Sequence, residues 1–170
     1  MDDAAVPSRH FLRKLVLGLV AGAISYVFVF WLHGPWGEIV AAVLIGSVVG
    51  IADRSPARVL VGSTACAAGW LLGSFLFGVW IELGVGAWLI AGAFLGAAFG
   101  AERRWWMAIP AMLPGLVAGL VAEASRYLTV FVTALRGLDM QLLLLLSAGL
   151  LLNFVAALMA PPFRRVNAGS

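Results

Sequence analysis

Three glutamates, Glu38, Glu82 and Glu123, stand where their spacing could support chemistry. Each extends a series of residues four apart, which forms one face of a helix, and each series includes small residues. Ionisable groups at membrane depth are costly and are therefore functional candidates. If the three series face inward, the carboxylates converge beneath one surface, with His33 and Arg126 nearby. That arrangement predicts an acidic pocket for a cation, a proton or a cationic solute.

The same residues also have a structural explanation. A carboxylate at a membrane interface costs little, and Glu123 and Arg126, three residues apart on one helix, could simply pair with each other. A lone histidine such as His33 is commonly an interfacial residue. The sequence leaves both interpretations open.

Other chemistry finds no support in the sequence. There is no zinc-protease or nucleophile-elbow motif, and His10 and His33 flank the first apolar run, so they cannot share a metal. Cys66 is the single cysteine. The segment Asp53–Arg58 partly matches a lipid-head-group transferase signature, but its glycine and downstream aspartates are missing. We therefore predict no catalytic residue and no metal site, the sequence leaves any cofactor unknown, and we expect Asp53 and Glu102 to be solvated.

The elements that must position these residues are apolar runs. Of the 170 residues, 63% are hydrophobic and only 11% are charged, against roughly 25% charged residues in soluble domains. A spanning helix needs about 20 apolar residues. The expected runs are Leu15–Leu32, Trp36–Ala52, Val59–Ile81, Leu83–Ala101, Trp105 to between Ala122 and Leu135, and Met140–Ala160. We predict an all-α polytopic membrane protein with a compact bundle of six spans.

The basic residues orient this bundle. Nine of the eleven basic residues lie in segments that six spans place on one side: the N-terminus, the second–third and fourth–fifth connections, and the C-terminal tail. The positive-inside rule then predicts cytoplasmic termini in a bacterial inner membrane. The expected regions are a cytoplasmic segment 1–14, a transmembrane domain 15–160 and a cytoplasmic tail 161–170. The net charge of +3 is thus a topology signal, and we predict no nucleic-acid partner.

Tryptophans and glycines add detail. Tryptophan favours membrane interfaces, and small residues four apart let helix backbones approach closely. We expect the outer boundary at Trp31, Trp36, Trp80 and Trp88, the inner boundary at Trp105 and Trp106, and Trp70 inside the bundle. The expected packing glycines are Gly18, Gly22, Gly46, Gly50, Gly69, Gly73, Gly92, Gly96, Gly100, Gly115 and Gly119. They could pack within the chain or dock another subunit.

A faint repeat accompanies the glycines. A Gly-x-x-x-Gly pair precedes an acidic and a basic residue at Gly46–Arg54 and again at Gly96–Arg104. Three hairpins, each entered from a basic segment, would explain the match, and so would chance, because glycine is abundant. In size and expected span number the chain is similar to the substrate-binding subunits of energy-coupling-factor importers, but no motif is shared.

The function expected from the sequence is that of a small-solute transporter or channel, or of the membrane subunit of one. The alternative is a non-catalytic scaffold or accessory subunit of a larger membrane complex. A membrane enzyme comes third, because the usual acid, base and metal residues are missing. The expected partners are the lipid bilayer and either other membrane subunits or further copies of the chain.

Overall fold

All regular secondary structure in the described part of the chain is helical. The computed structural model describes residues 6–32, 35–80, 86–125, 127 and 139–161. The helices are α1 (Val6–Leu32), α2 (Pro35–Asp53), α3 (Pro56–Trp80), α4 (Ala87–Arg103), the short 3₁₀ helix η1 (Trp105–Met107), α5 (Ala108–Ser125) and α7 (Met140–Met159). The predicted all-α class is confirmed.

Among the described residues, five helices are long and apolar enough to cross a membrane: α1, α2, α3, α5 and α7. The remaining α-helix, α4, has 17 residues and is about 26 Å long. These helices are compatible with an integral membrane protein. Their bounds follow the apolar runs, with one clear difference: α1 begins at Val6, before the apolar run starts at Leu15. Arginine and lysine are good helix formers, so the basic segment continues the helix.

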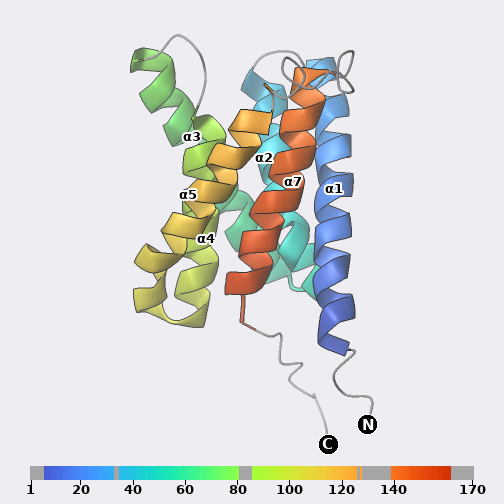
Figure 1. Ribbon diagram of the computed structural model, residues 1–170, viewed down its shortest axis with the longest axis vertical. Coiled ribbons are helices and arrows are strands. Elements are labelled where there is room, and N and C mark those ends of the chain that lie inside the picture. Colours follow the sequence, from blue (N-terminus) through green and yellow to red (C-terminus); the bar gives the residue numbers. More distant parts are fainter. Residues whose placement is uncertain (1–5, 33–34, 81–85, 126, 128–138, 162–170) are drawn as a thin grey trace, which may run out of the picture.

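The helices form a closed ring in which outer and inner members alternate (Figure 1). α1 packs against α2 and α7, α3 against α2 and α4, and α5 against α4 and α7. α7 also contacts α2 and α4, so α2, α4 and α7 are the inner helices. Within the apolar windows, 56% of the α2 residues are buried but only 17% of those in α1. The described helices therefore form three consecutive pairs, each an outer helix followed by an inner one.

Glycines set the distance between neighbouring helices. A Cβ atom at Gly18 would overlap the Gly149 carbonyl oxygen, and Gly46 and Gly62 meet in the same way across α2 and α3. Gly92 faces Gly115 across α4 and α5. Gly22, Gly50, Gly69, Gly73, Gly96, Gly100 and Gly119 also each face a neighbouring helix or η1 of the same chain. These glycines thus pack within the bundle.

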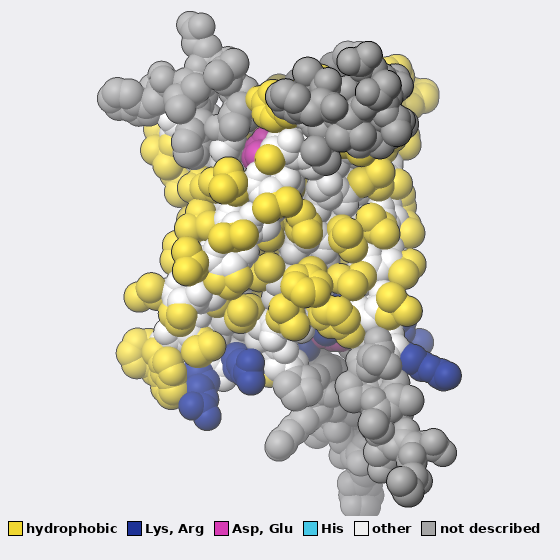
Figure 2. All heavy atoms as spheres, viewed as in Figure 1, with side chains coloured by type: hydrophobic (Ala, Val, Ile, Leu, Met, Phe, Trp, Pro, Cys, Tyr) yellow, Lys and Arg dark blue, Asp and Glu magenta, His cyan; other side chains and the backbone are white. Residues whose placement is uncertain are grey.

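The molecule is apolar both inside and outside. Phe99 and Leu145 are fully buried, whereas Phe75 on α3 is 68% exposed. Figure 2 shows hydrophobic side chains covering the middle of one face, with lysine and arginine gathered at one end. α1 begins and α7 ends at this basic end (Figure 1). An apolar band above a basic rim is the surface pattern of a protein in a lipid bilayer.

Burial separates two of the expected tryptophans. Trp70 is 7% exposed, which confirms its place in the bundle. Trp88 lies in the first turn of α4 and is 1% exposed, so its side chain packs in the core, and its position at the outer boundary stays a prediction. Trp31, Trp36, Trp105 and Trp106 are exposed.

Candidate functional site

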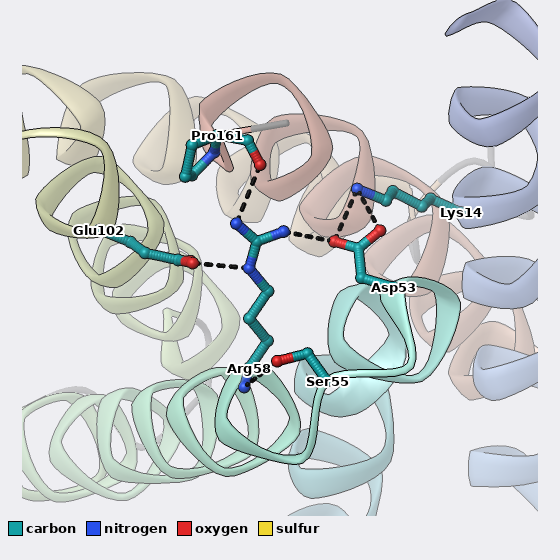
Figure 3. Close-up of polar contacts among 6 residues, drawn as sticks. All are labelled: Lys14, Asp53, Ser55, Arg58, Glu102 and Pro161. Atoms are coloured by element: carbon teal, nitrogen blue, oxygen red, sulfur yellow. Dashed lines mark hydrogen bonds and ion pairs between the residues drawn. The ribbon is translucent and has the colours of Figure 1, made fainter. Parts of the chain in front are cut away.

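A buried charge network joins the helices at the basic end (Figure 3). At its centre is Arg58, in the first turn of α3, whose side chain is 7% exposed. Its guanidinium donates to Asp53 Oδ2 at 2.6 Å, to Glu102 Oε1 at 2.6 Å and to the Pro161 carbonyl oxygen at 2.9 Å. Lys14 of α1 binds the same Asp53 at 3.0 Å. Arg58 thus contacts the chain at the C-terminal ends of α2, α4 and α7, which are the three inner helices.

The local sequence explains why Arg58 lies there. Ser55 N donates to Gly50 O and Arg54 N to Ile51 O, which is the hydrogen-bond pattern of a Schellman helix end. Arg54 has the left-handed φ of 53° that this motif requires. Ser55 then caps α3, since its Oγ accepts from the Arg58 N–H, and proline occupies the first helical position. The segment Asp53–Arg58 is therefore a tight helix–turn–helix connection.

The positive and negative side chains of this network are equal in number. Two cations, Lys14 and Arg58, face two carboxylates, Asp53 and Glu102. The C-terminal ends of helices also carry partial negative charge, so three of them around one guanidinium stabilise it further. The expectation that Asp53 is solvated is wrong, because its side chain is 5% exposed and pairs with residues from α1 and α3. Glu102 is partly exposed, at 32%, and paired.

Glu123 occupies a different place, near the opposite end of the bundle. It is 2% exposed and continues the face of α5 that carries Gly115 and Gly119. Its Oε1 accepts from the backbone N–H groups of Gly86 and Trp88, at 3.3 and 3.2 Å. Gly86, the N-cap of α4, has no side chain to satisfy these donors. Glu123 therefore caps a neighbouring helix, where a carboxylate is favoured.

Glu38 has other partners at that same end. Gln141 Nε2 of α7 donates to Glu38 Oε1 in the first turn of α2. Asp139, the N-cap of α7, accepts from the backbone of Gln141 and from the Tyr26 hydroxyl at 3.1 Å. These contacts join α1, α2 and α7 away from the basic end.

Two polar atoms inside the bundle lack hydrogen-bond partners among the described residues: Ser25 Oγ and Asn153 Oδ1. Both side chains are fully buried. The Asn153 amide nitrogen donates to Ile45 O at 3.1 Å and Gly149 O at 2.9 Å, so it holds α7 against α2.

The two described carboxylates of the expected acidic pocket contact different helices. Glu123 contacts α4, whereas Glu38 contacts α7. Glu82, His33 and Arg126 lie outside the described residues. Comparison with known proteins finds no matching family model, no matching curated protein and no matching solved structure. The chemistry of this chain is therefore argued from its own residues.

The sequence does not predict the charge network itself. Lys14 and Arg58 fit the positive-inside pattern, and Asp53 and Glu102 resemble solvated charges. One signal was available: the weak repeat places Asp53 and Glu102 at equivalent ends of two helices, and both carboxylates bind Arg58. No local pattern identified Arg58 as their shared partner.

Proposed function

We propose that this chain crosses a membrane six times, α4 included, with its basic end in the cytoplasm, and that it moves a small solute alone or as the membrane subunit of a transport system. In this proposal both termini are cytoplasmic and the membrane is a bacterial inner membrane. Support comes from the ring of apolar helices and from the basic residues collected at one end.

The transport proposal rests on Arg58, whose side chain contacts the C-terminal ends of all three inner helices. Replacing a buried ion-pair network by well-packed apolar residues is often neutral or stabilising, so such a network is weak evidence for stability alone. Ion pairs at one end can be exchanged or broken, unlike the glycine contacts along the rest of the bundle. Arg58 is thus suited to hold the cytoplasmic end of the inner helices closed in one state and to release it in another.

A cation or a proton is the solute class that we propose. The three described acidic residues at the end opposite Arg58, Glu38, Glu123 and Asp139, supply negative charge there, and the basic residues lie mainly at the other end. Carboxylates inside transporters commonly bind or relay cations.

The test uses the full chain in liposomes that contain either a pH-sensitive or a sodium-sensitive dye. A potassium gradient with valinomycin sets the membrane potential. We expect one of the two ions to enter faster than in protein-free liposomes, Glu123→Gln to slow that entry, and Glu102→Gln, which weakens the Arg58 network, to speed it. Entry of both ions at the protein-free rate would contradict transport by the chain alone.

A second candidate, a non-catalytic scaffold subunit, is favoured by the dense packing of the interior. Trp88, Leu95, Phe99, Leu144 and Leu145 are all fully buried in the core. Purification from the native membrane separates the candidates. A scaffold predicts a stoichiometric partner protein and no ion flux with or without that partner. An autonomous transporter predicts flux from the chain alone, and a transport subunit predicts flux only when the co-purified partner is added back.

A further inference from the structure

An apolar groove lies between α5 and α7 on the side of the bundle that faces away from its interior. It encloses about 480 Å³ and is lined by Leu113, Pro114, Val117, Ala118, Val121, Leu151, Phe154 and Val155. All eight side chains are apolar. Leu113 and Val117 are more than half exposed, at 66% and 53%, so the groove is open to the surroundings of the bundle.

The groove continues toward the basic end along one face of α5. Ile109, Leu113, Val117 and Val121 are spaced by four and form one row, and Ile109 is 79% exposed. Below α5 lies η1, with exposed Trp105 and Trp106. The distance from Leu113 to Val121 is about 12 Å along the helix axis. An apolar surface thus runs from an interfacial tryptophan pair into the groove.

Two exposed arginines lie at the lower end of this surface. Arg103 and Arg104 are exposed and immediately precede η1. Arg104 lies over the Trp106 ring, 5.3 Å from its centre. No acidic side chain in the described part of the chain forms an ion pair with either arginine. Figure 2 shows basic side chains below the hydrophobic band on this face.

We propose that this groove binds one acyl chain of an anionic phospholipid, whose phosphate is held by Arg103 and Arg104. Basic sites beside transmembrane helices on the cytoplasmic side suit anionic head groups. A helix with its side chains is about 10–12 Å across, so a 12 Å length of it occupies roughly 1,000 Å³, about twice the groove. A single acyl chain is much narrower. This lipid site requires only that the chain lies in a membrane, and it does not depend on the transport proposal.

The test is native mass spectrometry of the purified full chain, titrated with phosphatidylglycerol or with phosphatidylcholine of the same acyl chains. We expect one phosphatidylglycerol to bind in preference to phosphatidylcholine. Arg103→Gln with Arg104→Gln should weaken phosphatidylglycerol binding about 10- to 30-fold and weaken phosphatidylcholine, whose choline offsets the phosphate charge, much less. Val117→Trp, which fills the groove, should weaken both lipids.

Matched controls make the result specific. Arg9→Gln with Arg13→Gln removes two exposed charges from the same end on α1, and Val27→Trp adds the same bulk to an exposed site on α1. Both should retain phosphatidylglycerol. A photoreactive phosphatidylglycerol should label the tryptic peptide 105–126, which contains α5. Equal loss in the controls, retention by Val117→Trp, or a second protein chain in place of lipid would each overturn the proposal.

Discussion

The Arg58 Nε donates to Glu102 Oε1 at 2.6 Å, although the two residues are 44 positions apart and belong to α3 and α4. The same guanidinium reaches Asp53 at the end of α2 and Pro161 just beyond α7. The Arg58 side chain therefore links four helices, α2, α3, α4 and α7. Disturbing it should have consequences that disturbing an exposed arginine does not.

Removal of Arg58 should destabilise the bundle strongly. Arg58→Ala leaves Asp53 with Lys14 alone and leaves Glu102 without the partner shown here, and breaking a buried ion pair costs about 3–5 kcal/mol. The free energy of unfolding, measured by titrating detergent-solubilised protein with dodecyl sulfate, should fall by that amount. Arg103→Ala removes an exposed arginine and should change it by less than about 0.5 kcal/mol. Equal effects would show that the network does not hold the helices.

The turn between α2 and α3 should be improved by glycine. Arg54 adopts a left-handed φ of 53°, which costs a non-glycine residue about 1–2 kcal/mol. Its side chain is exposed, so Arg54→Gly should raise the free energy of unfolding by about 1 kcal/mol. Arg54→Val, which is β-branched, should lower it. The same detergent titration measures both, and stabilisation by valine would refute the assigned turn.

The contact between α1 and α7 should not tolerate a larger residue at its centre. A Cβ at Gly18 would overlap the Gly149 carbonyl oxygen, so Gly18→Ala should force the helices apart and cost about 1–3 kcal/mol. Gly149→Ala acts on the same contact, so the double substitution should cost less than the sum. Val20→Ala, at an exposed position on α1, serves as the control.

Glu123 should act partly through its bonds to α4. Glu123→Ala removes the acceptor for the Gly86 and Trp88 N–H groups and should cost about 1–2 kcal/mol, as the loss of a helix cap does. Glu123→Gln keeps an oxygen acceptor and should cost less. Stability measurements on both variants, made beside the ion-flux assay, separate capping from transport: a flux defect in a stable Glu123→Gln protein belongs to transport.

Membrane orientation can be read by cysteine labelling. In a Cys66→Ala background, the proposed topology places Arg54→Cys inside and Trp36→Cys outside; both native side chains are exposed. A membrane-impermeant maleimide added to intact cells should label position 36 and should label position 54 only after the membrane is opened. Labelling of position 54 in intact cells would reverse the orientation.

The helices could be predicted from the sequence because apolar runs and glycine spacing are local properties. Gly46 and Gly50 indicated a packing face on α2, and that face meets α3 at Gly62 and Val59. The extent of α5 could not be predicted, because the apolar pattern continues past Ala122. In the structure α5 ends at Ser125.

The charge network could not be predicted, because its partners are brought together only by the ring. Asp53 beside Arg54 resembles any solvated pair in a turn, and Lys14 lies 39 residues away. The carboxylates of the expected pocket also have partners that are set by the tertiary fold and are not visible in the sequence. Glu123 does follow its glycine row inward, but its partner is the backbone of α4 and not a second acidic residue.

The packing of α1 against α7 also gives the chain an order of completion. In the proposed topology α1 enters the membrane before α7, yet its Gly18 and Gly22 face has its partner, at Gly149 and Leu145, only when α7 arrives. A chain that stalls after α5 would leave this face and the α7-contacting surfaces of α2 and α4 uncovered. Among the described helices, α7 is therefore the one whose insertion closes the ring.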